Sequence, residues 1–207
     1  LLISNTWFPA LQRANVHLVT QAVASIAPNG VVGADGTKYP CDVIIWGTGF
    51  KATEFVAPMR IFGENLGVDV PGTCAAPAPE LGDIWRTQPA ATRLGITVAG
   101  FPNLFMLVGP NTGLGHNSII FMIECQVDYI VRALASLRQR GQVALRLRRE
   151  VQRDDYQLNQ RKMLGTVWAS GCKSWYQNAD GRIDTLWPGY TWEYWLKTRR
   201  FQIGDYL

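Results

Sequence analysis

The sequence predicts a protein of mixed α/β class, with an α+β arrangement inside the 207 residues of this chain. Three observations support this prediction. Short apolar runs separated by Asn-Gly and Asp-Gly pairs occupy residues 16–46, which is typical of antiparallel strands. Residues 101–134 combine a short apolar run, a glycine-rich turn and a long helical pattern. A second, more polar helix and an aromatic tail follow.

The N-terminal strands are expected to form an antiparallel meander. A first strand is expected at 16–20, and the next two meet at Asn29-Gly30, with Asp35-Gly36 as the following turn. The meander leads into a buried strand at 43–46, which ends at the turn formed by residues 47–49.

The turn after this strand matches the outline of a dinucleotide-binding fingerprint, because Gly47, Gly49 and Ala52 have the spacing G-x-G-x-x-A. That fingerprint requires a full helix directly behind the turn, and Pro58 follows too soon. It also requires a strand that ends in an acidic residue about 20 residues later, which the sequence lacks. We therefore interpret the turn as a crossing between domains that lies near a cofactor without binding its phosphates.

Residues 57–96 are rich in glycine and proline and are expected to form a long loop with one short helix near 81–85. Loops of this length are uncommon in compact domains unless they are functional or disordered. Residues 66–80 are expected to be a surface insertion in this loop.

The glycine-rich turn is the strongest candidate for a ligand site. Residues 104–108 are expected to form a strand buried on both faces. Asn117 or Ser118 can cap the helix that follows the turn. Its N-terminus would direct free N–H groups and the positive end of the helix dipole toward an anionic or electron-rich ligand, such as a phosphate or a flavin ring. An equally compatible alternative is that Gly113 and Gly115 only permit a tight turn.

The helix after this turn is expected to be buried except for a narrow polar stripe. Glu124, Asp128 and Arg132 recur every four positions, and Asp128 can pair with Arg132 across one turn. Gly141 is expected to end the helix.

The rest of the chain is expected to contain an exposed strand at 142–148, a polar helix at 150–164 and a turn at 178–181. Four residues of the tail share one helical face: Trp192, Trp195, Leu196 and Arg199. For any single tryptophan, packing in the core is favoured over lining a pocket for a flat ligand.

Composition excludes several classes of function. The net charge of +4 is mild and no nucleic-acid-binding motif occurs. Only His17 and His116 offer imidazoles, which argues against a metal centre. No apolar run is long enough to predict a transmembrane helix. The cysteines have no CxxC spacing and are expected to be free thiols of a cytoplasmic protein: Cys41, Cys74, Cys125 and Cys172.

Three segments resemble the flavin-containing monooxygenases, in particular the Baeyer–Villiger branch: PCDVIIWGTGFKAT (40–53), FPNLFMLVGPNTGLGHNS (101–118) and GCKSWY (171–176). The resemblance runs from residue 1 to about residue 200. It implies the C-terminal part of a flavoprotein with two dinucleotide-binding, Rossmann-like domains. Gly47 departs from the alanine usual in that family, and the insertion departs from its pattern.

The resemblance also implies a division of the chain. It assigns 1–50 to the end of the NADPH-binding domain and the return strand, and 51–100 to a linker and insertion loop. It assigns 101–140 to the C-terminal strand and helix of the FAD-binding domain, and 141–207 to a C-terminal extension. The family's FAD and NADPH fingerprints would precede residue 1, so the chain is expected to lack the N-terminal FAD- and NADPH-binding half.

The implied cofactors are FAD and NADP. In the family, NADPH reduces FAD, and a peroxyflavin formed with O2 inserts one oxygen atom into a ketone or a soft heteroatom of a small organic substrate. No side chain of this chain is expected to be catalytic. For His116, a hydrogen bond that fixes the loop is an alternative to a cofactor contact. The implied cofactor-binding residues are Thr48, Gly49, Phe50, Gly109, Asn111, Gly115, His116, Asn117, Ser118 and Trp175.

Two other functions remain open at this stage. One is a related flavoprotein, such as an amine N-hydroxylase; a disulfide reductase is disfavoured because no redox CxxC pair exists. The other is a non-enzymatic module that binds a partner protein and whose glycines are only structural.

Overall fold

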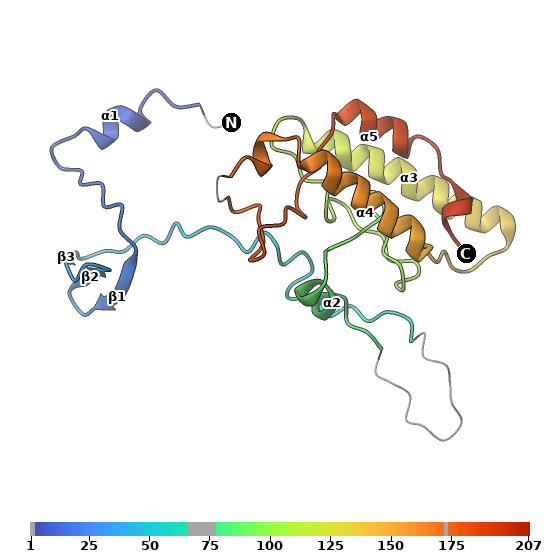
Figure 1. The fold of residues 1–207 in the computed structure, drawn as a ribbon, viewed down its shortest axis with the longest axis horizontal. Helices are drawn as coiled ribbons and strands as arrows, with labels where there is room; N and C mark the ends of the chain where they lie inside the picture. The colour runs from blue at the N-terminus through green and yellow to red at the C-terminus, as the bar shows by residue number, and fades with distance from the viewer. Residues whose placement is uncertain (1–2, 66–77, 172–173) are drawn as a thin grey trace, which may run out of the picture. The chain divides into compact units, whose positions relative to one another are not determined.

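The structure is a computed structural model that describes residues 3–65, 78–171 and 174–207 (Figure 1). The chain divides into two compact units, Leu1–Phe50 and Lys51–Leu207. Most of the insertion expected at 66–80 lies outside the described residues, as do Cys74 and Cys172.

The first unit contains the helix α1 (Trp7–Leu11) and a three-stranded antiparallel sheet in the order β1-β2-β3. Its strands are β1 (Val23–Ala27), β2 (Gly30–Gly33) and β3 (Lys38–Pro40). Ala27 pairs with Gly30, so β1 and β2 are joined by a two-residue turn. The expected meander is confirmed, with its first turn one residue earlier than predicted.

Two strands predicted in this unit are absent. Residues 16–20 and 43–46 form no strand, and the Ile45 side chain is 90% exposed. A strand exists only where a neighbouring strand pairs with its backbone N–H and C=O groups. No described segment does so for either run, and the apolar pattern alone was therefore misleading.

The named secondary-structure elements of the second unit are all helices (Figure 1). Its α-helices are α2 (Leu81–Thr87), α3 (Ile119–Arg140), α4 (Arg149–Met163) and α5 (Thr191–Thr198), with short 3₁₀ helices η1 (Val167–Ala169) and η2 (Ile203–Asp205). The predicted helices near 81–85, after Ser118 and at 150–164 are all confirmed. The coexistence of this unit with the antiparallel sheet confirms the mixed α and β content.

Both ends of α3 are determined by local signals that the sequence contains. The Ser118 hydroxyl accepts a hydrogen bond from the Phe121 N–H at 3.4 Å, which is the N-cap interaction. Gly141 has the left-handed φ of 64° that ends helices, and its N–H donates to the Leu137 and Arg138 carbonyls. Both predicted boundaries are therefore confirmed.

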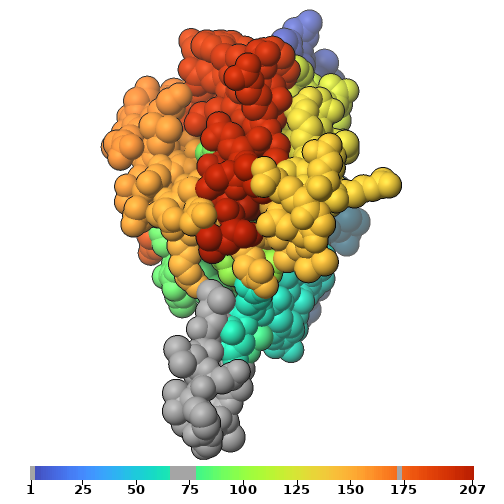
Figure 2. All heavy atoms as spheres, turned by 90° about the vertical axis from the view of Figure 1, so that its right-hand side faces the viewer, coloured from blue at the N-terminus to red at the C-terminus, as the bar shows by residue number. Residues whose placement is uncertain are grey.

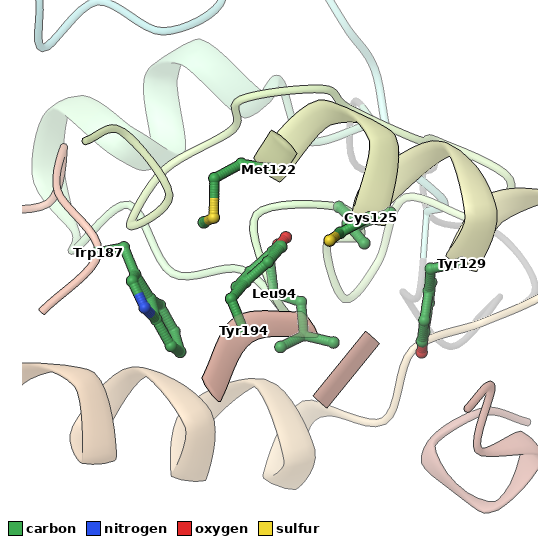
Figure 3. Packing of buried hydrophobic residues seen from close by; sticks show 7 residues of the cluster. Leu94, Met122, Cys125, Tyr129, Trp187 and Tyr194 are labelled. Carbon is green, nitrogen blue, oxygen red and sulfur yellow. The ribbon is translucent and has the colours of Figure 1, made fainter. Parts of the chain in front are cut away.

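The main core of this unit lies between α3, α5 and the loop after α2. Figure 3 shows Tyr194 projecting from α5 toward Met122 and Cys125 of α3. Figure 2 shows the surface of the C-terminal residues, in red, between those of orange and yellow segments. The buried members of this cluster are Leu94, Ile96, Met122, Cys125, Tyr129, Trp187 and Tyr194.

The strands predicted at 104–108 and 142–148 are absent. The Met106 N–H donates to the Ile96 carbonyl and the Val108 N–H donates to the Gln126 side chain, so no strand ladder forms at 104–108. In the second run a single antiparallel bridge joins Leu147 to Tyr206. Around this bridge, Arg146 and Leu207 exchange backbone hydrogen bonds and the Arg148 N–H donates to the Asp205 carbonyl. This pairing with the chain end is too short to count as a strand, and the 104–108 segment bonds to separate partners.

The exposed face of α3 is broader than the narrow polar stripe that was predicted. The expected pair is present, with Arg132 Nη2 3.4 Å from Asp128 Oδ2. However, four apolar side chains of the helix are also exposed, namely Ile120, Val127, Val131 and Leu134. No helix among the described residues is both long and apolar enough to cross a membrane.

Candidate functional site

The glycine-rich turn has an exposed end that adjoins the first turn of α3. His116, Asn117 and Ser118 are all exposed. The Asn117 side chain accepts from the Ser118 N–H at 2.8 Å and donates to the Thr191 hydroxyl at 3.1 Å. The amide therefore links the N-terminus of α3 to that of α5. The first N–H groups of an α-helix have no acceptor within the helix, so this end is where α3 can meet an electron-rich group.

The opposite end of the turn is buried and is used by the protein itself. The Asn111 N–H donates to the Asp184 carbonyl at 2.6 Å, and the Gly113 N–H donates to the Thr185 carbonyl at 2.8 Å. The Trp187 N–H returns a bond to the Gly113 carbonyl at 2.8 Å. These bonds form a short parallel pairing with residues 184–187. The N–H groups of this end are therefore occupied within the fold.

The side chain of Asn111 is also engaged internally. It is 2% exposed, its amide nitrogen donates to the Ala90 carbonyl at 3.0 Å, and its oxygen lies 3.4 Å from the Gln160 amide nitrogen. Asn111 has a φ of 65°, which asparagine tolerates better than most residues. The Asn111 side chain therefore stabilises the turn from inside the fold and is not free to contact a ligand.

The glycines of the turn permit close approaches by other parts of the chain. A Cβ at Gly109 would collide with the Gly95 carbonyl oxygen, and one at Gly113 would lie 2.8 Å from the Thr185 carbonyl oxygen. A Cβ at Gly115 would lie 2.5 Å from Cζ2 of Trp168. Each glycine is thus required by packing, whether or not a ligand also lies against it.

A surface cavity of about 380 Å³ lies beside the exposed end of the turn. His116, Trp168 and Tyr190 line it, and a 2.9 Å ion pair between Lys162 and Glu193 lies at its wall. Its aromatic and ionic lining could accept a flat polar group. Larger hollows of about 500 and 830 Å³ lie around α2, away from the turn residues, and one of about 550 Å³ lies within the first unit.

Trp175 is 63% exposed, and its ring contacts that of its neighbour Tyr176. The Trp175 and Tyr176 ring centroids are 4.3 Å apart at an interplanar angle of 30°. The turn that carries them is closed by a hydrogen bond from the Gln177 N–H to the Ser174 carbonyl at 3.0 Å. This arrangement presents the indole on the surface of a defined turn.

The three remaining candidate residues belong to the first unit. Thr48, Gly49 and Phe50 are exposed, and Gly49 has a φ of 83° that favours glycine. A Cβ at Gly49 would meet nothing within 4 Å, so the backbone conformation alone explains the glycine.

Sequence reasoning missed two polar residues that hold the turn in place. Gln126, on the buried side of α3, accepts from the Val108 N–H at 2.9 Å and donates to the Tyr194 hydroxyl at 2.9 Å. Asp184 accepts from the Tyr156 hydroxyl at 2.8 Å. Burial, and then the charge of Asp184, raise the pKa of Tyr156, so this hydroxyl remains a hydrogen-bond donor to a higher pH than an ordinary tyrosine. A polar residue on the apolar side of a helix was the available signal for Gln126.

Among the described residues, no group of three or more His, Cys, Asp or Glu side chains is placed so that it could hold a metal ion. Burial raises the pKa of the Tyr194 hydroxyl, which donates to the Leu94 carbonyl at 2.6 Å. The polar groups around the turn therefore fix its shape, and none of them forms a nucleophile–base pair.

Comparison with known proteins finds close relatives, although no protein-family model matches the chain. The chain is 39% identical over 208 residues to a Baeyer–Villiger monooxygenase of Pseudomonas aeruginosa, and 34% identical over 212 residues to an FAD-binding monooxygenase of Aspergillus niger. All of the chain is matched in both cases. It spans only 37% and 33% of the lengths of these relatives.

Among solved structures, a cyclohexanone monooxygenase from Rhodococcus sp. Phi1 bound to NADP⁺ matches 94% of this chain with a TM-score of 0.74 and 26% identity. The match covers 35% of that protein. Together with the sequence relatives, it confirms the resemblance indicated by the three segments and the mixed α/β fold class.

Proposed function

We propose that this chain, which matches Baeyer–Villiger flavin monooxygenases along its whole length, forms the C-terminal part of an FAD- and NADPH-dependent monooxygenase. The reaction inserts one oxygen atom from O2 into a ketone or a soft heteroatom of a small organic substrate. The observation that carries the proposal is the 39% identity that extends over the entire chain. The catalytic chemistry belongs to bound FAD, and the protein supplies binding, orientation and charge placement.

The exposed end of the glycine-rich turn is the part of this chain that fits a flavin. His116, Asn117, Ser118 and the first N–H groups of α3 lie together at the surface. The positive end of the α3 dipole would stabilise negative charge on the pyrimidine edge of reduced flavin. The role of the buried residues is structural, because close contacts with the rest of the fold fix the shape of the turn at Gly109, Asn111 and Gly115.

The other candidate residues have separate roles in this proposal. Thr48, Gly49 and Phe50 carry the chain from the NADPH-binding domain, which ends within 1–50, back to the FAD-binding domain. Residues 51–100 link the two, 101–140 complete the FAD-binding domain, and 141–207 form a C-terminal extension. Trp175 closes over the nicotinamide. Its exposed ring on a defined turn supports that role.

The proposed setting is a reducing, cytoplasmic one. The two cysteines that the structure describes, Cys41 and Cys125, are both unpaired thiols. Burial raises the pKa of the Cys125 thiol, which makes it an unreactive core residue at neutral pH. Disulfides are rare in reducing compartments, so unpaired thiols are consistent with this location.

The experiment that tests the function uses the complete polypeptide encoded by the gene, purified with its flavin. NADPH added without oxygen should bleach the flavin absorbance, and admission of O2 should restore it. With a cyclic ketone or a thioether present, the product should contain one atom from labelled O2. A complete polypeptide that binds no flavin, or whose flavin NADPH does not reduce, would overturn the proposal.

A further inference from the structure

An unbroken row of aromatic contacts joins the glycine-rich turn to Trp175. The row starts at Gly115, where the absence of a side chain leaves space for the six-membered ring of Trp168. Trp168 packs edge-on against Tyr176, with ring centroids 5.3 Å apart at 78°. Tyr176 in turn lies 4.3 Å from Trp175 at 30°. The edge-on pair has a geometry that is favourable for aromatic rings, and the second pair is a close, tilted ring contact.

The middle of this row is anchored and its end is exposed. Trp168 and Tyr176 pack against a buried cluster of Met163, Ile183 and Leu186. The Tyr176 carbonyl accepts a hydrogen bond from the Thr185 hydroxyl at 3.1 Å. Thr185 also accepts the Gly113 N–H, so the same residue contacts both the turn and the aromatic row. Trp175 has no such anchor, and its neighbour Tyr176 is its ring contact in the described part of the chain.

From this geometry we infer that Trp168 and Tyr176 are positioning residues, which hold the Trp175 indole at a set place relative to the flavin-facing turn. The inference rests on the proposed function, because it assigns Trp175 to the nicotinamide side. Trp168 touches neither cofactor in this scheme. Trp168 packs between Gly115 and Tyr176 and so fixes where the Tyr176 ring lies. The Tyr176 ring in turn contacts the Trp175 indole.

The Tyr176 contribution comes from its ring. No hydrogen bond of the Tyr176 hydroxyl occurs among the described residues, whereas its ring contacts two indoles. Tyr176→Phe keeps the ring and should leave NADPH kinetics unchanged, which makes it the matched control for Tyr176→Ala. A change in NADPH kinetics in Tyr176→Ala but not in Tyr176→Phe would show that the ring, and not the hydroxyl, positions Trp175.

A double-mutant cycle on the complete flavoprotein tests the coupling. Trp168→Ala and Trp175→Ala should each raise KM for NADPH, with Trp168→Ala raising it about 2- to 10-fold, the range expected for loss of one aromatic pair. Both variants should keep the FAD content of the wild type. The double variant should be no worse than Trp175→Ala alone, because Trp168 acts through Trp175. Additive effects, or loss of FAD from Trp168→Ala, would overturn the inference.

A second pair of variants covers the case in which Trp168→Ala does not fold. Gly115→Ala adds a methyl group against Cζ2 of Trp168, so it should displace the indole and raise KM for NADPH. Trp168→Phe removes the colliding ring atoms and should restore KM in the Gly115→Ala background. Gly204→Ala, at a position where a Cβ meets nothing within 4 Å, is the matched control. If Trp168→Phe does not restore KM for NADPH in the Gly115→Ala background, the proposed positioning role of Trp168 is wrong.

Failure of this inference is distinguishable from failure of the proposed function. A wild-type protein whose flavin NADPH cannot reduce would overturn the function itself. A wild-type protein with normal NADPH turnover, combined with Trp168→Ala kinetics equal to wild type, would overturn only the positioning role.

Discussion

At the scale of single residues, Arg93 is the centre of a buried ionic group in the second unit. It lies 3.0 Å from Asp155 and 2.8 Å from Asp205, and all three side chains are largely buried. Asp155 also accepts from the Leu94 N–H at 3.1 Å. The group therefore joins α4, the C-terminal η2 and the loop after α2. Removal of one member of a buried ion pair is costly, because it leaves an uncompensated charge out of water.

Asp155→Ala should accordingly lower the free energy of unfolding by about 3 kcal/mol. Asp154→Ala is a matched control on the same helix, since Asp154 pairs with Arg153 at 2.9 Å but is exposed. Exposed pairs contribute little, and this control should cost less than about 0.5 kcal/mol. Urea unfolding of both variants measures the difference. Equal costs for the two substitutions would show that the Arg93 group does not stabilise the fold.

Residue identity and spacing predicted the exposed end of the candidate site better than its buried end. Ser118 was identified as a cap because serine before an apolar helix is a local signal. The internal use of Asn111 could not be read from the sequence, because its partners, Ala90 and Asp184, come from separate segments. The same is true of Gly115, whose reason for being glycine is the approach of Trp168.

At the scale of elements, helices were predictable and isolated strands were not. A helix satisfies its own backbone hydrogen bonds, so local signals suffice to locate it: the caps and periodicity of α3, and the residue pattern of α4. A strand depends on a partner that its own sequence does not contain. The meander was found because Asn29-Gly30 and Asp35-Gly36 bring the partners together locally. The apolar runs at 43–46 and 104–108 have no such local partner.

The C-terminal cap of α3 allows a test at this scale. Gly141 has a φ of 64°, which costs a residue with a Cβ roughly 1 kcal/mol or more. Gly141→Ala should therefore lower the free energy of unfolding by about 1 kcal/mol and leave flavin content of the complete protein unchanged, because the cap lies at the opposite end of α3 from the turn. Thermal unfolding and the visible absorbance measure the two effects. An unchanged stability would contradict the cap assignment.

At the scale of the whole molecule, three buried tyrosines and the partly buried Tyr156 predict how the fold responds to alkali. Burial raises the pKa of Tyr129, Tyr156, Tyr194 and Tyr206 above the ordinary value of about 10. The folded protein therefore holds these protons more tightly than the unfolded chain does. Their contribution to stability is fully present below about pH 10 and is lost as the pH rises above that value.

We therefore expect a cooperative alkaline transition in which unfolding and tyrosine ionisation coincide. Circular dichroism reports the loss of helix, and tyrosinate absorbance reports ionisation in the same titration. Tyr129→Phe removes one of the titrating groups and should weaken the pH dependence of unfolding. Ionisation of all tyrosines near pH 10 with the helices intact would contradict the buried positions of these side chains.

The surface of the described residues gives a final prediction about cofactor retention. Four apolar side chains of α3 are exposed, and so are residues 45 and 46 of the first unit. Apolar surfaces of this kind are normally covered by other protein.

The chain spans 37% of the length of its Pseudomonas aeruginosa relative, and the N–H groups at Asn111 and Gly113 are occupied internally. Within the glycine-rich turn, the exposed end is therefore the part that can contact a flavin. The 207-residue chain purified alone should therefore retain FAD at well below one equivalent and bind an apolar fluorescent dye. The complete polypeptide prepared in parallel should retain about one equivalent and bind less dye. Stoichiometric flavin absorbance in the 207-residue chain would show that this chain alone binds FAD fully. The expectation that flavin binding needs further protein would then be wrong.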